Sequence, residues 1–252
     1  GGTKHEHVKP AFEALFRRHG LPKAIQSDNG PPFACTMALG GLSRLSAWWV
    51  ALGIHVVRSR PGCPQDNGGH ERMHVDVVEL QERSAPTALA QQARFDDWVV
   101  EFNTVRPHEA LSMLTPAEVY RASERRLAGL VVPGYPQHWI CHRVGAAGTF
   151  EHQGHKIYAT TVLSGHVVGL EQRATGEVAV WFHDLALGQF VPGVDNSVQP
   201  LVENVTAQPV ANVEATASPV QPVVDIGVAA NHVAPVARVE AVASLAIETV
   251  TS

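Results

Sequence analysis

The stretch Arg60-Pro-Gly-Cys-Pro-Gln-Asp-Asn-Gly-Gly-His-Glu-Arg-Met-His74 decides how this sequence is interpreted. Its prolines and glycines exclude regular structure in the first part, and Asp66 or Asn67 offers a side-chain oxygen that can cap a helix. The spacing predicts that a helix begins near Gly68. Glu71 then lies in the first turn, where the helix dipole favours a carboxylate and a rigid element can hold it as a metal ligand.

The same letters contain a second signature. His70-Glu71-Arg72-Met73-His74 matches H-E-x-x-H, in which two histidines bind zinc and the glutamate acts as general base. Zinc proteolysis also needs an established helix and a third ligand, but His70 directly follows two glycines and no G-x-x-H extension follows His74. A zinc peptidase is therefore a minor alternative, beside a capped surface helix with solvated side chains.

An upstream carboxylate stands in Ile25-Gln-Ser-Asp28-Asn-Gly-Pro-Pro-Phe33. Residues 23–26 predict a short strand that closes in an Asp-Asn-Gly turn, so Asp28 comes at the end of that strand. Alone, such a turn is more often a hydrogen-bonded loop than a site. A second strand is expected over residues 54–58, leading into the loop before Glu71.

Several other elements follow from hydrophobic spacing. The patterns predict helices over residues 8–19, within 37–52 and from Leu89 to near Pro107, and a short capped helix over 115–122. After Glu71, the residues Met73, Val77 and Leu80 form a stripe that needs burial.

Together, Ser27-Asp-Asn-Gly-x-x-Phe33 and Arg60-Pro-Gly-x-Pro-x-x-Asn-Gly-x-x-Glu-Arg72 resemble the DDE integrase superfamily. More narrowly, they are similar to bacterial insertion-sequence transposases with a retroviral-integrase-like core. The resemblance extends through residues 40–53 and 103–111 and covers most of residues 8–120. It implies a ribonuclease-H-like α/β core and an activity in DNA transposition, with phosphodiester cleavage and strand transfer.

The resemblance also implies the site. Asp28 and Glu71 would be catalytic metal ligands for two Mg²⁺ or Mn²⁺ ions, about 3.5–4 Å apart in such sites, which stabilise the attacking and leaving oxygens. Carboxylates suit these hard ions. The expected partners are DNA, as transposon ends and target, and further copies of the chain. The candidate DNA-binding side chains are Lys23, Arg58, Arg60 and Arg72.

The family takes its first catalytic aspartate from a strand that precedes the opening helix. Upstream of Asp28 the acidic residues are Glu6 and Glu13, and Glu13 falls on the predicted helix. We therefore expect a core that is truncated at its N-terminus, lacks its first strands and is inactive as this fragment. A non-catalytic DNA-binding or assembly remnant is the alternative.

The sequence divides into three predicted parts. Residues 1–128 form the partial integrase core, and residues 129–193 form a small antiparallel β-barrel-like domain with a hairpin turn at Ala174-Thr-Gly-Glu177. Residues 194–252 contain no Phe, Tyr or Trp and are predicted to be a disordered, functionally silent tail of low complexity.

Composition bounds the remaining possibilities. The formal net charge of −5 falls on residues 194–252, which hold six acidic residues and one basic residue, Arg238, so the preceding part is neutral. DNA affinity would then depend on local basic groups rather than on a broad positive patch. Cys35, Cys63 and Cys141 form no C-x-x-C pair, and no apolar run approaches 18 residues, so we expect a reducing cytoplasm and no membrane partner.

Overall fold

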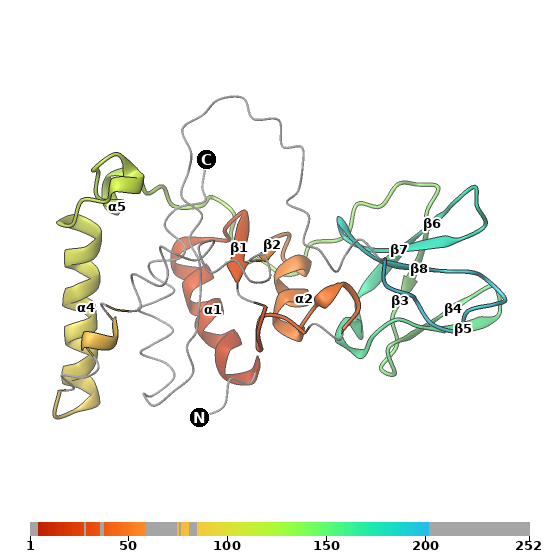
Figure 1. The fold of residues 1–252 in the computed structure, drawn as a ribbon, viewed down its shortest axis with the longest axis horizontal. Helices are drawn as coiled ribbons and strands as arrows, with labels where there is room; N and C mark the ends of the chain where they lie inside the picture. The colour runs from red at the N-terminus through yellow and green to blue at the C-terminus, as the bar shows by residue number, and fades with distance from the viewer. Residues whose placement is uncertain are drawn as a thin grey trace. The chain divides into compact units, whose positions relative to one another are not determined.

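The computed structural model describes residues 5–27, 29–35, 38–58, 75, 77–80 and 85–201, and these fall into two compact units (Figure 1). Among the described residues, unit 1 holds 5–27, 54–58, 75, 77–80 and 85–128, whereas unit 2 holds 29–35, 38–53 and 129–201. The expected continuous core over residues 1–128 differs from this division, because residues 29–53 cluster with the β-rich part. No helix in the described ranges is long and apolar enough to cross a membrane.

Unit 1 contains one helix and a pair of parallel strands near its start. The helix α1 (His5–His19) buries Phe12 and Phe16, as the spacing predicts. The strands β1 (Ala24–Ser27) and β2 (His55–Arg58) pair in parallel, with Ala24 opposite His55 and Ser27 opposite Arg58. Both strands were expected from the sequence, and the resulting mixed α/β arrangement is consistent with an integrase core.

The second half of unit 1 is helical. The helix α4 (Ala88–Thr104) begins at Thr87, whose side chain accepts a hydrogen bond from the Ala90 N–H at 3.2 Å, and η3 (Glu109–Leu111) follows it. The helix α5 (Pro116–Val119) starts with the predicted capping interaction, in which Glu118 accepts from the Thr115 N–H at 2.7 Å. This helix ends at Val119, earlier than predicted.

Residues 120–125, here called the clasp, hold the turn that joins α1 to β1. The Ser123 hydroxyl donates to the Leu21 carbonyl at 2.7 Å, and the Arg125 guanidinium donates to the Pro22 carbonyl at 2.8 Å. Gly20 has φ +85°, and a Cβ there would lie 2.5 Å from the Ser123 carbonyl oxygen. The clasp therefore fixes the point from which β1 starts.

Unit 2 begins with two short helical elements. The turn η1 (Leu39–Gly41) and the helix α2 (Arg44–Ala51) replace the longer helix that the sequence predicted. Gly40 and Gly41 have φ of +62° and +64°, a left-handed conformation that interrupts a right-handed helix. Ser43 then caps the new helix, and its side chain accepts from the Ser46 N–H at 3.1 Å. Trp49 is buried and stacks on Phe33, so both belong to the core of unit 2.

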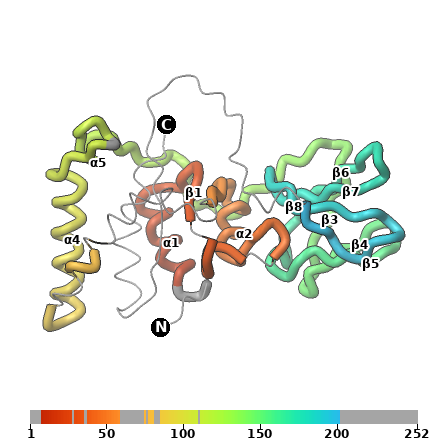
Figure 2. The backbone as a smooth tube through the Cα atoms, in the orientation of Figure 1, coloured from red at the N-terminus to blue at the C-terminus, as the bar shows by residue number. Residues whose placement is uncertain are grey.

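Two antiparallel sheets make up the rest of unit 2 (Figure 1). One sheet has the order β3-β6-β7-β8. The other is the hairpin of β4 and β5, which can be followed in Figure 2. The predicted turn at residues 174–177 joins β6 to β7, and the Arg173 N–H donates to the Glu177 carbonyl at 2.9 Å. The bounds are β3 (Ile140–Arg143), β4 (Thr149–His152), β5 (His155–Tyr158), η4 (Thr161–Leu163), β6 (Val167–Gln172), β7 (Val178–Phe182) and β8 (Leu185–Phe190).

Residues 194–201, here called the arm, belong to unit 2 and bridge the two sheets. Ser197 pairs with Tyr158 of β5, and Gln199 pairs with Gln189 of β8 through hydrogen bonds of 2.7 and 2.9 Å. Val198, which stands between Ser197 and Gln199 in the sequence, is buried. The prediction that disorder begins at residue 194 is therefore wrong, because backbone pairing rather than large side chains anchors the arm. Residues 202–252 lie outside the described ranges.

The core of unit 2 contains an uncommon pair of histidines. The rings of His142 and His152 lie 5.7 Å apart at 89°, among Phe150 and Phe190. Within the described part, both Nε2 atoms are buried without a hydrogen-bond partner. Burial lowers the pKa of His142 against the opposing effect of Glu151, while burial and then the neighbouring His142 lower the pKa of His152.

The arm generates a prediction about stability. A chain that ends after Leu201 should melt at a higher temperature than one that ends after Gly193, because only the longer chain retains the hydrogen bonds and the buried Val198. The expected difference is several degrees, measured by circular dichroism. Equal melting temperatures would show that the arm contributes no stability, and Val198→Ala in the full chain should reproduce part of the loss.

The histidine pair predicts acid sensitivity. Since the folded-state pKa values lie below the ordinary value, the unfolded chain binds more protons, so stability is fully present above about pH 6.5 and falls as the pH drops below it. We expect a lower melting temperature at pH 5 than at pH 7.5. The double variant His142→Phe, His152→Leu should narrow this difference, whereas the exposed His138→Gln should not change it. If the double variant keeps the same difference in melting temperature between pH 5 and pH 7.5, the acid sensitivity does not come from this histidine pair.

Candidate functional site

The candidate site begins at one edge of the β1–β2 pair. Because the strands are parallel and Ser27 is opposite Arg58, both strands end at the same edge. Asp28 directly follows β1, and the chain after Arg58 leads to Glu71. Ligand sites of α/β proteins form outside the carboxyl ends of parallel strands, so this edge is where two carboxylates from these segments would meet.

Six of the predicted site residues lie outside the described ranges. They are Asp28, Arg60, His70, Glu71, Arg72 and His74. The separation of the Asp28 and Glu71 carboxylates therefore stays a prediction, as does the zinc alternative. The structure places the parts of the chain that precede and follow these residues.

The helix expected after Glu71 is visible at residues 75 and 77–80. Val77 is buried, as the predicted stripe requires, while Val75 and Val78 are exposed. Gln91 of α4 ties down the end of this segment, since its amide donates to the Leu80 carbonyl at 3.1 Å and accepts from the Ala85 N–H at 2.7 Å. The helix that leads away from Glu71 is thus anchored on α4.

The two described candidate DNA contacts occupy different places. Arg58 ends β2 at the candidate edge and is half-buried. Lys23 is exposed and precedes β1, so four residues of extended strand, about 13 Å, separate it from Ser27. Arg58 therefore stands beside the candidate site, whereas Lys23 belongs to the opposite end of the strand pair.

The acidic residue Glu13 forms ion pairs with two basic residues of its own helix. It lies on α1, as predicted, with Lys9 at 3.7 Å and Arg17 at 3.4 Å. Both are i,i+4 pairs on the helix surface, which contribute a few tenths of a kcal/mol, about 0.3–0.5. Glu13 is thus part of a surface charge pattern rather than of the β1–β2 edge.

A metal centre made from described residues alone is not present. In the ranges that the structure describes, no three His, Cys, Asp or Glu side chains gather to hold an ion. The predicted donors, Asp28 and Glu71, supply carboxylate oxygens, the ligands that Mg²⁺ prefers. The donor chemistry of these two residues therefore suits a hard divalent cation.

Three residues that position this edge were not predicted from the sequence. Ser123 and Arg125 bind the turn before β1, and Gln91 binds the segment after the Glu71 helix. Gln91 offered a faint signal, because it occupies the same α4 face as the buried Phe95, four residues later. Ser123 and Arg125 offered none, since their partners lie about a hundred residues away in sequence.

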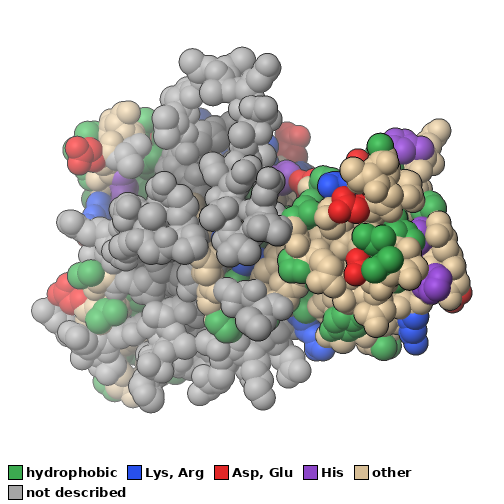
Figure 3. All heavy atoms as spheres, turned by 45° about the vertical axis from the view of Figure 1, so that its right-hand side comes forward, with side chains coloured by type: hydrophobic (Ala, Val, Ile, Leu, Met, Phe, Trp, Pro, Cys, Tyr) green, Lys and Arg blue, Asp and Glu red, His purple; other side chains and the backbone are tan. Residues whose placement is uncertain are grey.

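The surface of unit 2 carries charges of both signs. On the face seen in Figure 3, acidic, basic and histidine side chains are interspersed with apolar ones. This mixed character agrees with the neutral balance of residues 1–193.

Comparisons with known proteins find an integrase core domain in this chain. Residues 52–116, which include Glu71 and the 103–111 motif, match the integrase core domain family. The chain is 29% identical over 129 residues to an uncharacterized 31.7 kDa protein of insertion element IS407 from Burkholderia multivorans, covering 50% of this chain and 44% of the relative. It is 30% identical over 125 residues to an uncharacterized 39.2 kDa protein of insertion element IS476 from Xanthomonas euvesicatoria, covering 49% and 34%.

A viral relative matches as well. The Pol polyprotein of feline endogenous virus ECE1 is 33% identical over 96 residues, which are 38% of this chain and 8% of that protein. The chain spans less than half the length of the insertion-element relatives. The domain match, these relatives and the two sequence motifs support the likeness of this chain to bacterial insertion-sequence transposases of the DDE integrase superfamily.

Proposed function

We propose that this chain supplies two metal ligands, Asp28 and Glu71, to a DDE transposase that acts in DNA integration through metal-dependent phosphodiester cleavage and strand transfer. The 252 residues by themselves are expected to be inactive. The observation that carries the proposal is the register of β1 and β2. It supports a shared site because Asp28 and the segment that leads to Glu71 leave the strand pair at the same edge. The matched integrase core domain supports the reaction class.

In this proposal, Asp28 and Glu71 hold Mg²⁺ or Mn²⁺. When bound, two such ions supply charge stabilisation for the attacking and leaving oxygens of an in-line displacement. The chain's own task is positioning. The clasp fixes the start of β1, and Gln91 anchors the segment beyond Glu71, so both carboxylates would be carried on restrained elements.

The substrate in this proposal is DNA, as transposon ends and target. Arg58 stands at the edge where the strands end, and Arg60 and Arg72 flank Glu71 in the sequence. Guanidinium groups bind phosphates through paired hydrogen bonds, so these residues would hold the backbone near the ions. Further copies of the chain would bring two transposon ends together.

A second candidate is a non-catalytic DNA-binding or assembly role. The observation that favours it is the separate core of unit 2, whose sheets and arm form a compact body without any contribution from Asp28 or Glu71. The two candidates differ in whether a divalent ion is bound.

Metal binding tests the proposed site. We expect Mn²⁺ to bind the full chain weakly, with affinity reduced at least about tenfold in Asp28→Asn and in Glu71→Gln, because each change removes a charged ligand. Calorimetry or electron paramagnetic resonance measures the affinity. Glu79→Gln is the matched control, since Glu79 is an exposed carboxylate in the helical residues 77–80. Equal affinity in all four proteins would overturn the site and leave the non-catalytic candidate.

Plasmid nicking tests the activity of the 252-residue chain. We expect no nicking of supercoiled plasmid with Mn²⁺, because two carboxylates are too few to hold two ions and neutralise their charge. Duplex DNA should nevertheless bind, with an affinity that falls as salt rises. Nicking by the wild-type chain that disappears in Glu71→Gln would contradict the expected inactivity and point to a third ligand, such as Asp66 or a residue of another copy.

A further inference from the structure

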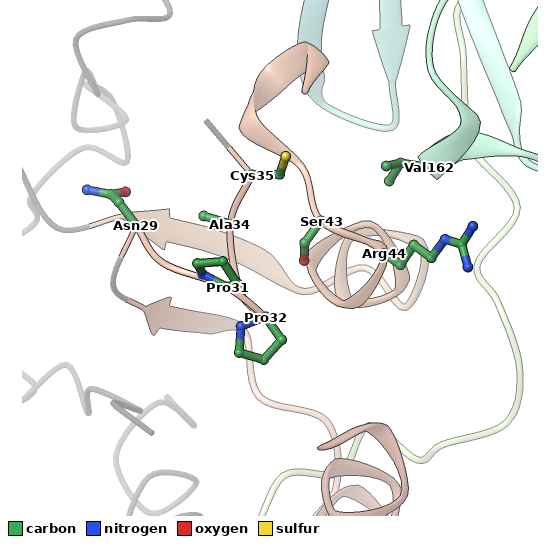
Figure 4. Close-up of a pocket in the computed structure, with 8 residues that line it drawn as sticks. All are labelled: Asn29, Pro31, Pro32, Ala34, Cys35, Ser43, Arg44 and Val162. Atoms are coloured by element: carbon green, nitrogen blue, oxygen red, sulfur yellow. The ribbon is translucent and has the colours of Figure 1, made fainter. Parts of the chain in front are cut away.

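A pocket of about 370 Å³ lies in unit 2, between the segment that follows β1 and the start of α2 (Figure 4). Asn29 is among its lining residues, and Asn29 is the residue directly after Asp28. The pocket therefore starts one residue beyond a proposed metal ligand. Its volume falls within the range of small-molecule sites, which are about 300–1,000 Å³.

The walls of the pocket are mainly apolar. They are formed by Pro31, Pro32, Ala34 and Val162. Pro32 and Ala34 are buried, so this part of the wall is fixed by the core of unit 2. Figure 4 shows both proline rings beside Ala34, with Val162 across from them. An apolar part of a ligand that contacts these walls would be favoured, because the contact removes apolar surface from water.

Arg44 supplies the charge at this pocket. It is the first residue of α2, it is exposed, and its side chain passes Val162 with the guanidinium on the side away from the proline rings (Figure 4). Across the described ranges, no hydrogen bond or ion pair engages its guanidinium. The neighbouring Ser43 is different, because its hydroxyl already donates to the Phe33 carbonyl at 3.0 Å and accepts from the Ser46 N–H. Arg44 is thus the charged group in the lining of this pocket.

A cation beside an apolar pocket matches a ligand that has a phosphate and a flat ring. We propose that the pocket accepts one unpaired nucleotide of a DNA strand, with the base against the proline and Val162 walls and the phosphate on Arg44. Contact through the face of a base tolerates any sequence, and a guanidinium forms two parallel hydrogen bonds with a phosphate. This inference rests on the proposed function and adds a strand-end subsite to it.

The test compares two duplexes of equal length, one blunt and one with a single unpaired terminal nucleotide. Fluorescence anisotropy of the full chain should show at least about fivefold tighter binding of the second duplex. Arg44→Gln should abolish this preference and Arg44→Lys should restore part of it, since lysine keeps the charge but not the paired geometry. Arg126→Gln is the control, because Arg126 is an exposed arginine remote in sequence from the pocket, and its loss should leave the preference intact.

A second variant tests the walls. Val162→Phe narrows the pocket without altering charge, so it should remove the preference while leaving blunt-duplex affinity and the circular dichroism spectrum unchanged. If the wild-type chain binds both duplexes equally, or if Arg44→Gln keeps the preference, the subsite is overturned and the proposed function stands. If the chain binds neither duplex at any salt concentration, the proposed DNA function fails as well.

Discussion

The parallel pairing of β1 with β2 is the constraint on which the candidate site depends. Two strands of four residues each are too short to be stable alone, and a parallel pair requires a long crossover connection, here residues 28–54. Their stability therefore comes from elements around them. The clasp provides one such support by binding the turn before β1 through backbone and side-chain hydrogen bonds, with Gly20 allowing the close approach.

In unit 2 the constraint is a different one, because its sheets have strand edges that would otherwise be unpaired. The arm lies along β8 and meets the end of β5, so edges that would invite other chains are partly occupied by the protein's own backbone. Gly188 makes this approach possible, because any Cβ there would overlap the Gln199 carbonyl oxygen. Pairing of this kind needs no aromatic residue, which explains how a segment without large side chains is ordered.

Any DNA binding by this chain would rest on local groups rather than on overall charge. Residues 1–193 carry no net charge and so offer no long-range attraction for DNA. Recognition would therefore depend on single arginines placed where the phosphate backbone of the DNA passes. Arg58 at the end of β2 and Arg44 beside an apolar pocket are two such placements. They belong to different units, and each is positioned by its own local structure: a strand end for the first and a capped helix start for the second.

The sequence by itself indicated the likeness to the DDE integrase superfamily, the presence of the helices α1, α4 and α5, the two short strands of unit 1 and the antiparallel character of residues 140–190. These features depend on short-range periodicity, capping residues and turn signals, which are readable within a few positions. Tertiary structure alone decided the strand register, the interruption before α2, the clasp, the Gln91 anchor and the arm. The register, the clasp and the contact of the arm with β5 join segments distant in sequence, and such contacts are chosen by packing and backbone pairing that no local pattern encodes. The interruption before α2 and the Gln91 anchor involve nearer residues, whose conformation the local pattern left open.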